Sequence, residues 1–554
     1  MPVLKFKIDN LLKNIPHADL ETIRDTLFRL KCETEILEDG FLEVEINPDR
    51  PDMYSLEGLV RAVKGLLELE RGWSKPSTHD TGIVVEVSSV ASRPYIATAV
   101  VYNVNIRDDE DLRQLIQFQE KLHDTIGRRR RKVAIGFHDL DKLPSKQIYY
   151  KALRIDEIEF PPLGIGYAKK ASKILIETEQ GQKYGHISLK DKLHPFLLSG
   201  SDVIAMPPVI NSNITRIEVG TKHLFIDVTG TSKEAVEKVL DIIVSNLAER
   251  KGASIGQVKV LYNDVYITYP SLRTIETVLD LDYVNNILGY SLEPHRAIEL
   301  LGYMRYNAYF MEGKRIRVEV PPFRADYISP IDLVEDIAIA IGYEKLQPCR
   351  PEKYTRGQLL YKNEIKRILR DLLVGMGFTE VMQLSLVSPD DVEPIPRKPV
   401  FIKNPVQRDY SVLRTDLIIS LLGVLRQNQL LKKPVKLFEI GRIAYLAENQ
   451  EIVEKDMIAL AVMDDEMSIE KIQSPLYTLL DIIGIEYSIS SECTEQIFIQ
   501  GRCGSLLLGN QKLAEFGEVN PEILEKQNIE YPTAYANIDL EVLTKWSSKT
   551  LHRQ

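Results

Sequence analysis

This chain of 554 residues lacks CxxC-type cysteine spacings and long apolar runs. The four cysteines are Cys32, Cys349, Cys493 and Cys503, and none of them stands in a CxxC-type spacing. Neither a zinc site nor a disulfide framework is therefore predicted, and we expect free thiols in a reducing cytoplasm. No stretch approaches about 18 uninterrupted apolar residues, and the first residues lack the layout of a signal sequence. We expect no membrane segment.

An excess of positive charge is also missing. The chain has 70 lysines and arginines against 80 acidic residues, which gives a net charge of −10. A protein that coats nucleic acid with its whole surface is usually basic, so an RNA partner would be held locally or by another subunit. The hydrophobic fraction of 44% and the charged fraction of 27% are ordinary for folded protein. The length predicts roughly three to five domains.

Changes of pattern along the chain predict four parts and an α+β multi-domain fold. Residues 1–75 form a small α/β module, with alternating strands and a helix capped by Ser55. Residues 76–265 form a larger mixed block, and residues 266–350 hold three helices around a strand. In residues 351–554 we expect helices at 358–376, 415–430 and 466–484, and strands at 380–385, 400–402, 435–440, 457–463 and 534–539.

Four acidic residues, Asp326, Asp332, Glu335 and Asp336, surround a predicted helix start at Ser329-Pro330. The last three stand at i, i+3 and i+4, so they share one face of the helix. Oxygen donors without histidine or cysteine suit a hard cation, magnesium before calcium or manganese. These residues also have a simpler interpretation. Asp332 completes a capping box, and an acidic face exposed to water needs no metal.

This stretch resembles a module of phenylalanyl-tRNA synthetase beta subunits of the archaeal/eukaryotic type. The shared pattern is a strand, two prolines, Arg-x-Asp, and Asp-x-x-Glu-Asp on a helix that ends in Gly-Tyr, here Gly342-Tyr343. The resemblance extends over essentially the whole chain. Further similar motifs are Glu45–Asp52, Gly136–Asp141, Pro207–Ser212, Ile226–Gly230, Leu413–Thr415 and Phe438–Gly441.

The resemblance implies one half of a ligase that attaches phenylalanine to its tRNA using ATP. An alpha-type partner would bind phenylalanine and ATP and perform the chemistry, in an (αβ)2 heterotetramer. The archaeal branch binds Mg2+ with four acids on a face toward the partner. The implied magnesium ligands here are Asp326, Asp332, Glu335 and Asp336. The four parts become an N-terminal module (1–75), a tRNA-editing module (76–265), a magnesium-site module (266–350) and a catalytic-like domain (351–554).

Editing would remove tyrosine, which differs from phenylalanine by one hydroxyl. A hydrophobic pocket rejects an added hydroxyl only about 100-fold, so a second, hydrolytic site is needed. The polar candidates for that site are Asp227, Asn211 and His138. Asp227 either faces a pocket or caps a turn, and His138 is more simply a hydrogen-bonded support. No Ser-His-Asp or Cys-His arrangement is visible in the sequence. The resemblance therefore implies hydrolysis by water, assisted by the RNA.

The run Arg128, Arg129, Arg130, Arg131 and Lys132 is strongly basic. Charge runs are usually solvated faces. Because this one adjoins a module that would receive the 3′ end of an RNA, contact with phosphates is the alternative. The run is too short to explain binding of a whole tRNA.

Residues 351–554 resemble a class II synthetase domain that has lost its ATP-binding arginines. In that class an arginine stands two residues before a strand glutamate and offsets phosphate charge. Here the glutamate is Glu439, but the earlier position is Leu437. The late arginine motif is also missing. We therefore expect a degenerate, antiparallel-sheet domain that catalyses no aminoacylation and supports the partner, with Arg414 as a structural or interface residue.

Three other functions compete with the ligase subunit. A free-standing deacylase of mischarged tRNA would not need the second large fold after the editing block. A metal-dependent phosphotransferase would need a glycine loop to hold phosphates, and none accompanies the acidic residues. A scaffold without enzymatic activity would lose nothing when Asp227 and Asn211 are replaced.

Overall fold

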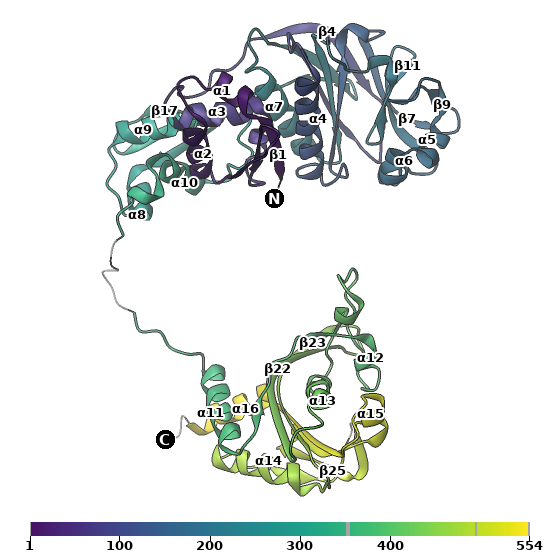
Figure 1. The fold of residues 1–554 in the computed structure, drawn as a ribbon, viewed down its shortest axis with the longest axis vertical. Coiled ribbons are helices and arrows are strands. Elements are labelled where there is room, and N and C mark those ends of the chain that lie inside the picture. The colour runs from purple at the N-terminus through teal and green to yellow at the C-terminus, as the bar shows by residue number, and fades with distance from the viewer. Residues whose placement is uncertain (1, 349, 351–354, 494–495, 552–554) are drawn as a thin grey trace. The chain divides into compact units, whose positions relative to one another are not determined.

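The computed structural model describes residues 2–348, 350, 355–493 and 496–551. The chain divides into two compact units, Met1–Pro351 and Glu352–Gln554 (Figure 1). A mixed α/β protein of several domains is thereby confirmed, and the division of the first unit into three modules stays a prediction. Among the described residues, no helix is both long and apolar enough to cross a membrane.

The first unit begins with a three-stranded antiparallel sheet in the order β1-β3-β2. Its elements are β1 (Val3–Lys7), α1 (Ile8–Asn14), α2 (Leu20–Arg29), β2 (Glu33–Ile36), β3 (Phe41–Glu45) and α3 (Leu56–Leu66). Helix α3 starts where predicted, because the Ser55 hydroxyl accepts a hydrogen bond from the Gly58 amide. Leu59 and Val63 on its inner face are completely buried.

A ten-stranded sheet follows, in the order β12-β11-β10-β7-β4-β14-β5-β13-β6, with β15 added beside β14. Strand β4 runs parallel to β7 and β14, and the other pairs are antiparallel. The strands are β4 (Thr78–Val87), β5 (Tyr95–Tyr102), β6 (Val133–Asp139), β7 (Gln147–Arg154), β10 (Leu193–Ser199), β11 (Asp202–Met206), β12 (Ile210–Asn211), β13 (Leu224–Gly230), β14 (Ser254–Tyr262) and β15 (Val265–Tyr269). A small pair, β8 (Glu159–Phe160) and β9 (Lys169–Lys170), lies outside this sheet.

Four helices accompany this sheet: α4 (Asp109–Asp124), α5 (Ala171–Glu177), α6 (Glu179–Tyr184) and α7 (Lys233–Leu247). Helix α4 is well specified by its sequence. Asp108 caps it by accepting from the Asp111 amide, and three acidic residues occupy its first turn, where they favour the helix dipole. Its buried face includes Leu115, Phe118 and His123, so the helix is fixed against the unit.

The last part of the first unit is a three-stranded sheet, β16-β18-β17, with three helices. Its elements are β16 (Ile275–Asp280), α8 (Leu281–Leu288), α9 (Pro294–Tyr303), β17 (Asn307–Phe310), β18 (Arg315–Val320) and α10 (Pro330–Ile341). Helix α10 begins at Pro330, and Ser329 and Asp332 form the expected capping box. Val334, Ile337 and Ile341 are buried on its inner side.

The second unit is built on a seven-stranded sheet in the order β19-β22-β23-β27-β26-β25-β24. All neighbours are antiparallel except β19 and β22. Its strands are β19 (Thr379–Glu380), β22 (Val435–Leu446), β23 (Ile452–Met463), β24 (Ser488–Ser490), β25 (Phe498–Leu508), β26 (Gln511–Val519) and β27 (Thr533–Asp539). The helices are α11 (Tyr361–Gly375), α12 (Pro389–Val392), α13 (Ile418–Gln427), α14 (Glu470–Ile482), α15 (Pro521–Lys526) and α16 (Leu540–Leu551), and β20 (Leu386–Val387) pairs with β21 (Val412–Leu413).

Two predicted strands of this unit are wrong. Of the strand expected at 380–385, only Glu380 lies in a strand, β19. The strand expected at 400–402 is a single bridge between Phe401 and Val412. Both segments carry β-favouring side chains but lack a partner strand along their length, and β propensity depends on such partners.

The expectation of free cysteines is also wrong for one pair. Cys493 and Cys503 form a disulfide across ten positions of the sequence. Cys32 is free and buried, and burial raises the pKa of its thiol to about 12. Cys349 lies outside the described residues. The partners of the disulfide are brought together by the pairing of β24 with β25, which the sequence pattern did not reveal.

Candidate functional site

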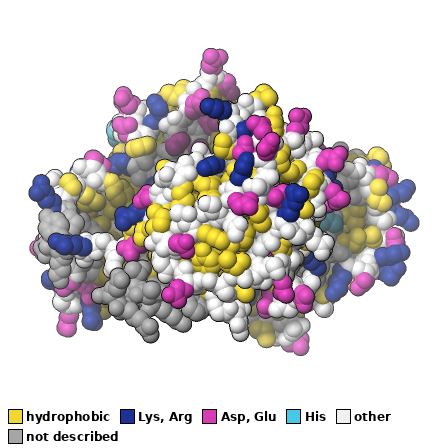
Figure 2. Space-filling view, turned by 90° about the horizontal axis from the view of Figure 1, so that it is seen from below, with side chains coloured by type: hydrophobic (Ala, Val, Ile, Leu, Met, Phe, Trp, Pro, Cys, Tyr) yellow, Lys and Arg dark blue, Asp and Glu magenta, His cyan; other side chains and the backbone are white. Residues whose placement is uncertain are grey.

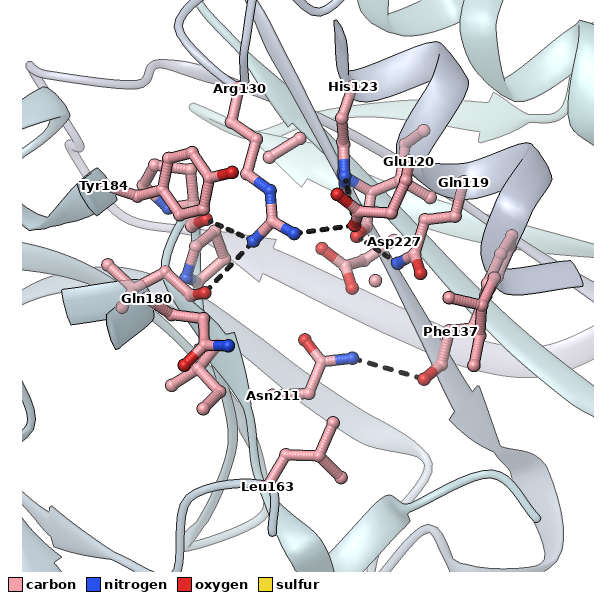
Figure 3. Close-up of a pocket in the computed structure, with 18 of the residues that line it drawn as sticks. Gln119, Glu120, His123, Arg130, Phe137, Leu163, Gln180, Tyr184, Asn211 and Asp227 are labelled. Carbon is pink, nitrogen blue, oxygen red and sulfur yellow. Dashed lines mark hydrogen bonds and ion pairs between the residues drawn. The ribbon is translucent and has the colours of Figure 1, made fainter. Parts of the chain in front are cut away.

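A cavity of about 530 Å³ lies in the first unit between α4, α6, β6 and the turn from β11 to β12 (Figure 3). Its polar lining residues include Gln119, Glu120, His123, Arg130, Gln180, Tyr184, Asn211, Arg216 and Asp227. Leu112, Ile116, Phe137, Leu163 and Ile217 supply apolar wall. The structure thus brings two predicted site residues, Asp227 and Asn211, to one cavity. His138 does not border it.

His138 contacts Asp227 on the side away from the cavity. Its Nε2 lies 2.9 Å from Asp227 Oδ2, and its Nδ1 lies 2.7 Å from the hydroxyl of Thr215. An ionised carboxylate can only accept, so Nε2 carries the proton and Nδ1 accepts from the Thr215 hydroxyl. This is a hydroxyl–imidazole–carboxylate chain that the sequence did not show. Of these three residues, only Asp227 lines the cavity.

The register of β6 and β13 places these groups. Asp227 pairs directly with Gly136, and Phe225 pairs with His138. Residues two apart on a strand share a face, so Gly136, His138 and Asp227 lie on one side of the sheet. A Cβ atom on Gly136 would stand 1.9 Å from Asp227 Oδ2. Glycine at this position therefore makes the space for the carboxylate.

Asn211 lies on the opposite part of the wall. Its Nδ2 donates to the Phe137 carbonyl oxygen at 3.2 Å. Figure 3 shows the side chains of Asn211 and Asp227 pointing into the same cavity. The pair offers an amide and a carboxylate for binding a polar group within a largely apolar enclosure, as specific ligand sites do.

Of the four arginines in the basic run, one lines the cavity and three are exposed to solvent. Arg128, Arg129 and Arg131 are exposed, whereas Arg130 is partly buried and lines the cavity. The prediction treated the four alike, because a run of identical residues carries no signal of which side chain turns inward.

The four acidic residues near α10 are held by protein groups. Arg324 Nη2 lies 2.6 Å from both Asp326 Oδ2 and Asp336 Oδ2. Asp332 Oδ2 accepts from the amides of Ile328 and Ser329 at 2.7 Å.

Glu335 pairs with Lys31 at 3.1 Å. Tyr306 donates its hydroxyl to Asp336 Oδ2 at 2.5 Å. Each of the four acids therefore already has a donor from the chain itself.

These residues do not fit a magnesium ion in this arrangement. Burial raises the pKa of Asp326, but the charge of Arg324 outweighs it and lowers that pKa to about 2. Burial raises the pKa of Asp336. Arg324 is completely buried and supplies the positive charge between them. Within the described residues, no group of three or more acidic, histidine or cysteine side chains is arranged to hold a metal.

Buried side chains fill one face of the sheet in the second unit, around Leu437 and Glu439. Leu437 is buried in an apolar cluster with α13, together with Ala459, Ala461 and Tyr535. Arg414 Nη1 forms a buried ion pair with Glu439 Oε1 at 2.5 Å and donates to Ser420 at 2.8 Å. Arg414 therefore makes buried contacts within the unit, and its role as a structural or interface residue stays a prediction.

A cavity of about 600 Å³ in the second unit differs in charge from the first. It is lined by three glutamates, Glu518, Glu525 and Glu530, and by no lysine or arginine. A nucleoside triphosphate needs cations or oriented donors to offset its charge. This cavity is therefore unsuited to ATP.

Sequence comparison places the chain among known proteins. Residues 349–540 match the family described as "Phenylalanyl tRNA synthetase beta chain CLM domain", and residues 277–343 match the "tRNA synthetase B5 domain". A protein of Aeropyrum pernix named "Phenylalanine--tRNA ligase beta subunit" is 48% identical, over 99% of this chain and 100% of its own. A protein of the same name from Sulfurisphaera tokodaii is 41% identical, over 97% and 98%.

A solved structure supports the fold of the first unit. It is an N-terminal fragment of the phenylalanyl-tRNA synthetase beta subunit from Pyrococcus horikoshii, 36% identical, with a TM-score of 0.59. The similarity covers 62% of this chain and all of that fragment. The order of elements in the first unit is therefore shared with a known protein.

Proposed function

This chain belongs to the family of phenylalanine–tRNA ligase beta subunits, and from that premise we propose that it hydrolyses mischarged tyrosyl-tRNA in the 530 Å³ cavity. As a beta subunit it is part of an aminoacyl-tRNA ligase, an enzyme that joins phenylalanine to its tRNA. Its second unit supports the catalytic alpha-type subunit. The assembly we propose is an (αβ)2 heterotetramer, in which phenylalanine and ATP bind to the partner.

The position of Asp227 is the observation that carries the hydrolytic function. Its carboxylate borders the cavity and is oriented by His138 from behind. A tyrosyl hydroxyl would donate to this carboxylate, whereas a phenylalanyl group would give it no donor beyond His138 and would place an apolar ring beside its charge. A site built to bind a hydroxyl rejects an analogue lacking it strongly, because an unpaired buried polar group is costly.

Water attacks the ester bond in this proposal. The hydroxyl in the chain Thr215–His138–Asp227 is buried away from the cavity, so it does not serve as the nucleophile. Asn211 and Asp227 fix the amino-acid end of the substrate, and the one free hydroxyl of the terminal ribose assists the water. Positioning of this kind accelerates hydrolysis, because the reacting groups are held in the right orientation and less solvent has to reorganise. Hydrolysis releases tyrosine and restores the ribose hydroxyl that carried it.

The exposed arginines beside the cavity suit the RNA. Arg128, Arg129 and Arg131 follow α4, whose residues Glu120 and His123 line the cavity. We propose that they contact phosphates near the 3′ end of the tRNA. Phosphate contacts orient an RNA and weaken with salt.

The second unit carries exposed apolar side chains suited to a protein partner. Met382, Leu384, Phe401 and Val406 are more than 60% exposed. The two segments that hold them are joined by the pairing of β20 with β21 and by the bridge at Phe401. Exposed apolar patches of this kind mark protein interfaces, and we propose that the alpha-type subunit covers this one.

Charge on the second unit is mixed. Figure 2 shows apolar side chains gathered in the middle of one face, with acidic and basic side chains interspersed around them. Such a surface suits a protein partner better than an extended RNA, which attracts a basic surface.

Magnesium at Asp326, Asp332, Glu335 and Asp336 stays a prediction of the family resemblance. For it to hold, Glu335 would have to leave Lys31, and Arg324 would have to release Asp326 or Asp336. We assign no step of the reaction to this ion.

The function is tested by charging and deacylation with the same preparation. The chain, the alpha-type subunit and their mixture are supplied with labelled phenylalanine, ATP, magnesium and cognate tRNA. We expect charging only by the mixture. With Asp227→Ala in the mixture, we expect unchanged phenylalanine charging and, when labelled tyrosine replaces phenylalanine, accumulation of tyrosyl-tRNA. Charging without accumulation would overturn the hydrolytic role and leave the supporting role intact.

A further inference from the structure

Three successive arginines beside the cavity adopt left-handed backbone conformations. The φ angles of Arg128, Arg129 and Arg130 are 49°, 54° and 64°. Residues with a Cβ atom disfavour this region, because the Cβ atom approaches the following carbonyl oxygen. Such conformations persist where surrounding contacts hold them, often at functional sites.

The turn is held tightly at its base. The Arg130 amide donates to His123 O at 3.3 Å, and the Lys132 amide donates to Gly127 O at 2.8 Å. A Cβ atom on Gly127 would lie 2.5 Å from His123 O. The left-handed turn therefore follows α4 directly and turns the Arg130 side chain back over that helix.

Arg130 joins three walls of the cavity. Its Nη2 donates to Glu120 Oε1 of α4 at 2.7 Å. Its Nη1 donates to the carbonyl oxygens of Pro208 and Val209 at 3.2 and 3.1 Å, in the turn from β11 to β12. Its guanidinium carbon stands 4.4 Å from the ring centre of Tyr184 in α6. Figure 3 shows these contacts spanning one side of the cavity.

Glu120 also accepts a hydrogen bond from His123. His123 Nε2 accepts from the Ile135 amide at 2.8 Å, so its Nδ1 carries the proton and donates to Glu120 Oε1 at 3.1 Å. Burial lowers the pKa of His123, which keeps the ring neutral. Burial raises the pKa of Glu120, but His123 and Arg130 outweigh it and lower that pKa to about 2. The carboxylate that receives Arg130 is thus ionised and accepts from two donors.

We propose that Arg130 is a positioning residue for the hydrolysis of mischarged tRNA, and that its guanidinium fixes the 207–211 segment so that Asn211 faces Asp227. The inference rests on the proposed function. It separates Arg130 from Arg128, Arg129 and Arg131, which act on the RNA outside. A lysine cannot replace Arg130, since an ammonium lacks the planar fork that meets a carboxylate and two carbonyl oxygens at once.

The test uses the assembled ligase and preformed tyrosyl-tRNA. Arg130→Lys is compared with Arg154→Lys, the same change at an exposed arginine whose partner is the surface residue Glu157. We expect Arg130→Lys to lower kcat for deacylation by about 10- to 100-fold, as a displaced positioning group does, with KM for the tRNA within about twofold. Arg154→Lys should change neither constant.

Rescue distinguishes positioning from a damaged fold. Millimolar guanidinium should restore part of the deacylation by Arg130→Ala, and an equal concentration of sodium should not. If Arg130→Ala does not fold, Arg130→Lys decides alone. Deacylation by Arg130→Lys within twofold of the unchanged protein, at equal melting temperature, would overturn the inference.

Asp227→Ala is measured in parallel. If Asp227→Ala loses deacylation and Arg130→Lys does not, only the inference about Arg130 is wrong. If both variants keep it, the proposed function itself is wrong.

Discussion

The two units differ in where their buried polar side chains lie. In the first unit, charged and polar side chains line part of a largely apolar cavity of about 530 Å³, and His138 holds one of them, Asp227, in place. In the second, Arg414 and Glu439 form an ion pair inside the protein, and Leu437 is buried in an apolar cluster beside them. The comparison teaches that a polar side chain bordering a cavity is available to a ligand, whereas buried polar groups that pair with each other are not.

The largest loss of stability is expected when the buried ion pair of the second unit is broken. Arg414→Ala would leave the buried Glu439 without its cationic partner, which costs about 3–5 kcal/mol. Chemical unfolding monitored by circular dichroism should show this loss in the second unit. Lys398→Ala, an exposed residue of the same unit, is the control. An unchanged free energy of unfolding would show that the ion pair between Arg414 and Glu439 does not stabilise the second unit.

A smaller loss in the same unit is expected from the disulfide. Cys503→Ser opens the loop closed by Cys493 and should lower the free energy of unfolding by about 2–3 kcal/mol, by the chain-entropy relation. Reducing agent should destabilise the unchanged protein by the same amount and leave the variant unaffected. If the reductant acts equally on both, the bond is not formed in solution.

In the first unit we expect a substitution that raises the free energy of unfolding. Burial raises the pKa of Asp241, in α7, to about 6. The folded state therefore holds this proton more tightly than the unfolded chain, and stability falls as pH rises from about 4 to 6. Asp241→Asn should stabilise the protein at pH 7 by on the order of 2 kcal/mol and have little effect at pH 4. Equal effects at both pH values would contradict the titration.

The smallest effect is expected from magnesium. Because Arg324 already pairs with Asp326 and Asp336, adding millimolar magnesium to the chain alone should leave its melting temperature unchanged. A bound ion at 100 times its Kd would stabilise by about 2.7 kcal/mol. Stabilisation that disappears in Asp336→Asn would establish the magnesium site that the family resemblance implies.

Local signals in the sequence predicted local structure well. The helix from Ser329-Pro330 is found as expected, since its cap, its proline and its apolar face all lie within one stretch. The strands at 435–440 and 457–463 are likewise present within β22 and β23. The strand over 380–385 failed because no neighbouring strand follows it beyond Glu380.

The cavity depended on contacts that no local pattern contains. Asp227 and Asn211 were identified through family resemblance, and the structure brings both to one cavity. Thr215, Glu120 and His123 were missed. Each is an ordinary residue in its own segment, and its role arises only when α4, β6 and β13 come together in the fold.

Deacylation of preformed tyrosyl-tRNA by the assembled ligase tests the contrast between the units most directly. It is measured for Asp227→Ala, which alters the open cavity, and for Glu439→Gln, which alters the filled face, with phenylalanine charging recorded for both. The account predicts that Asp227→Ala loses about 100-fold or more in deacylation and retains charging, a loss typical of a specific polar contact. Glu439→Gln should retain deacylation. Full deacylation by Asp227→Ala, or its loss in Glu439→Gln at equal stability, would contradict the account.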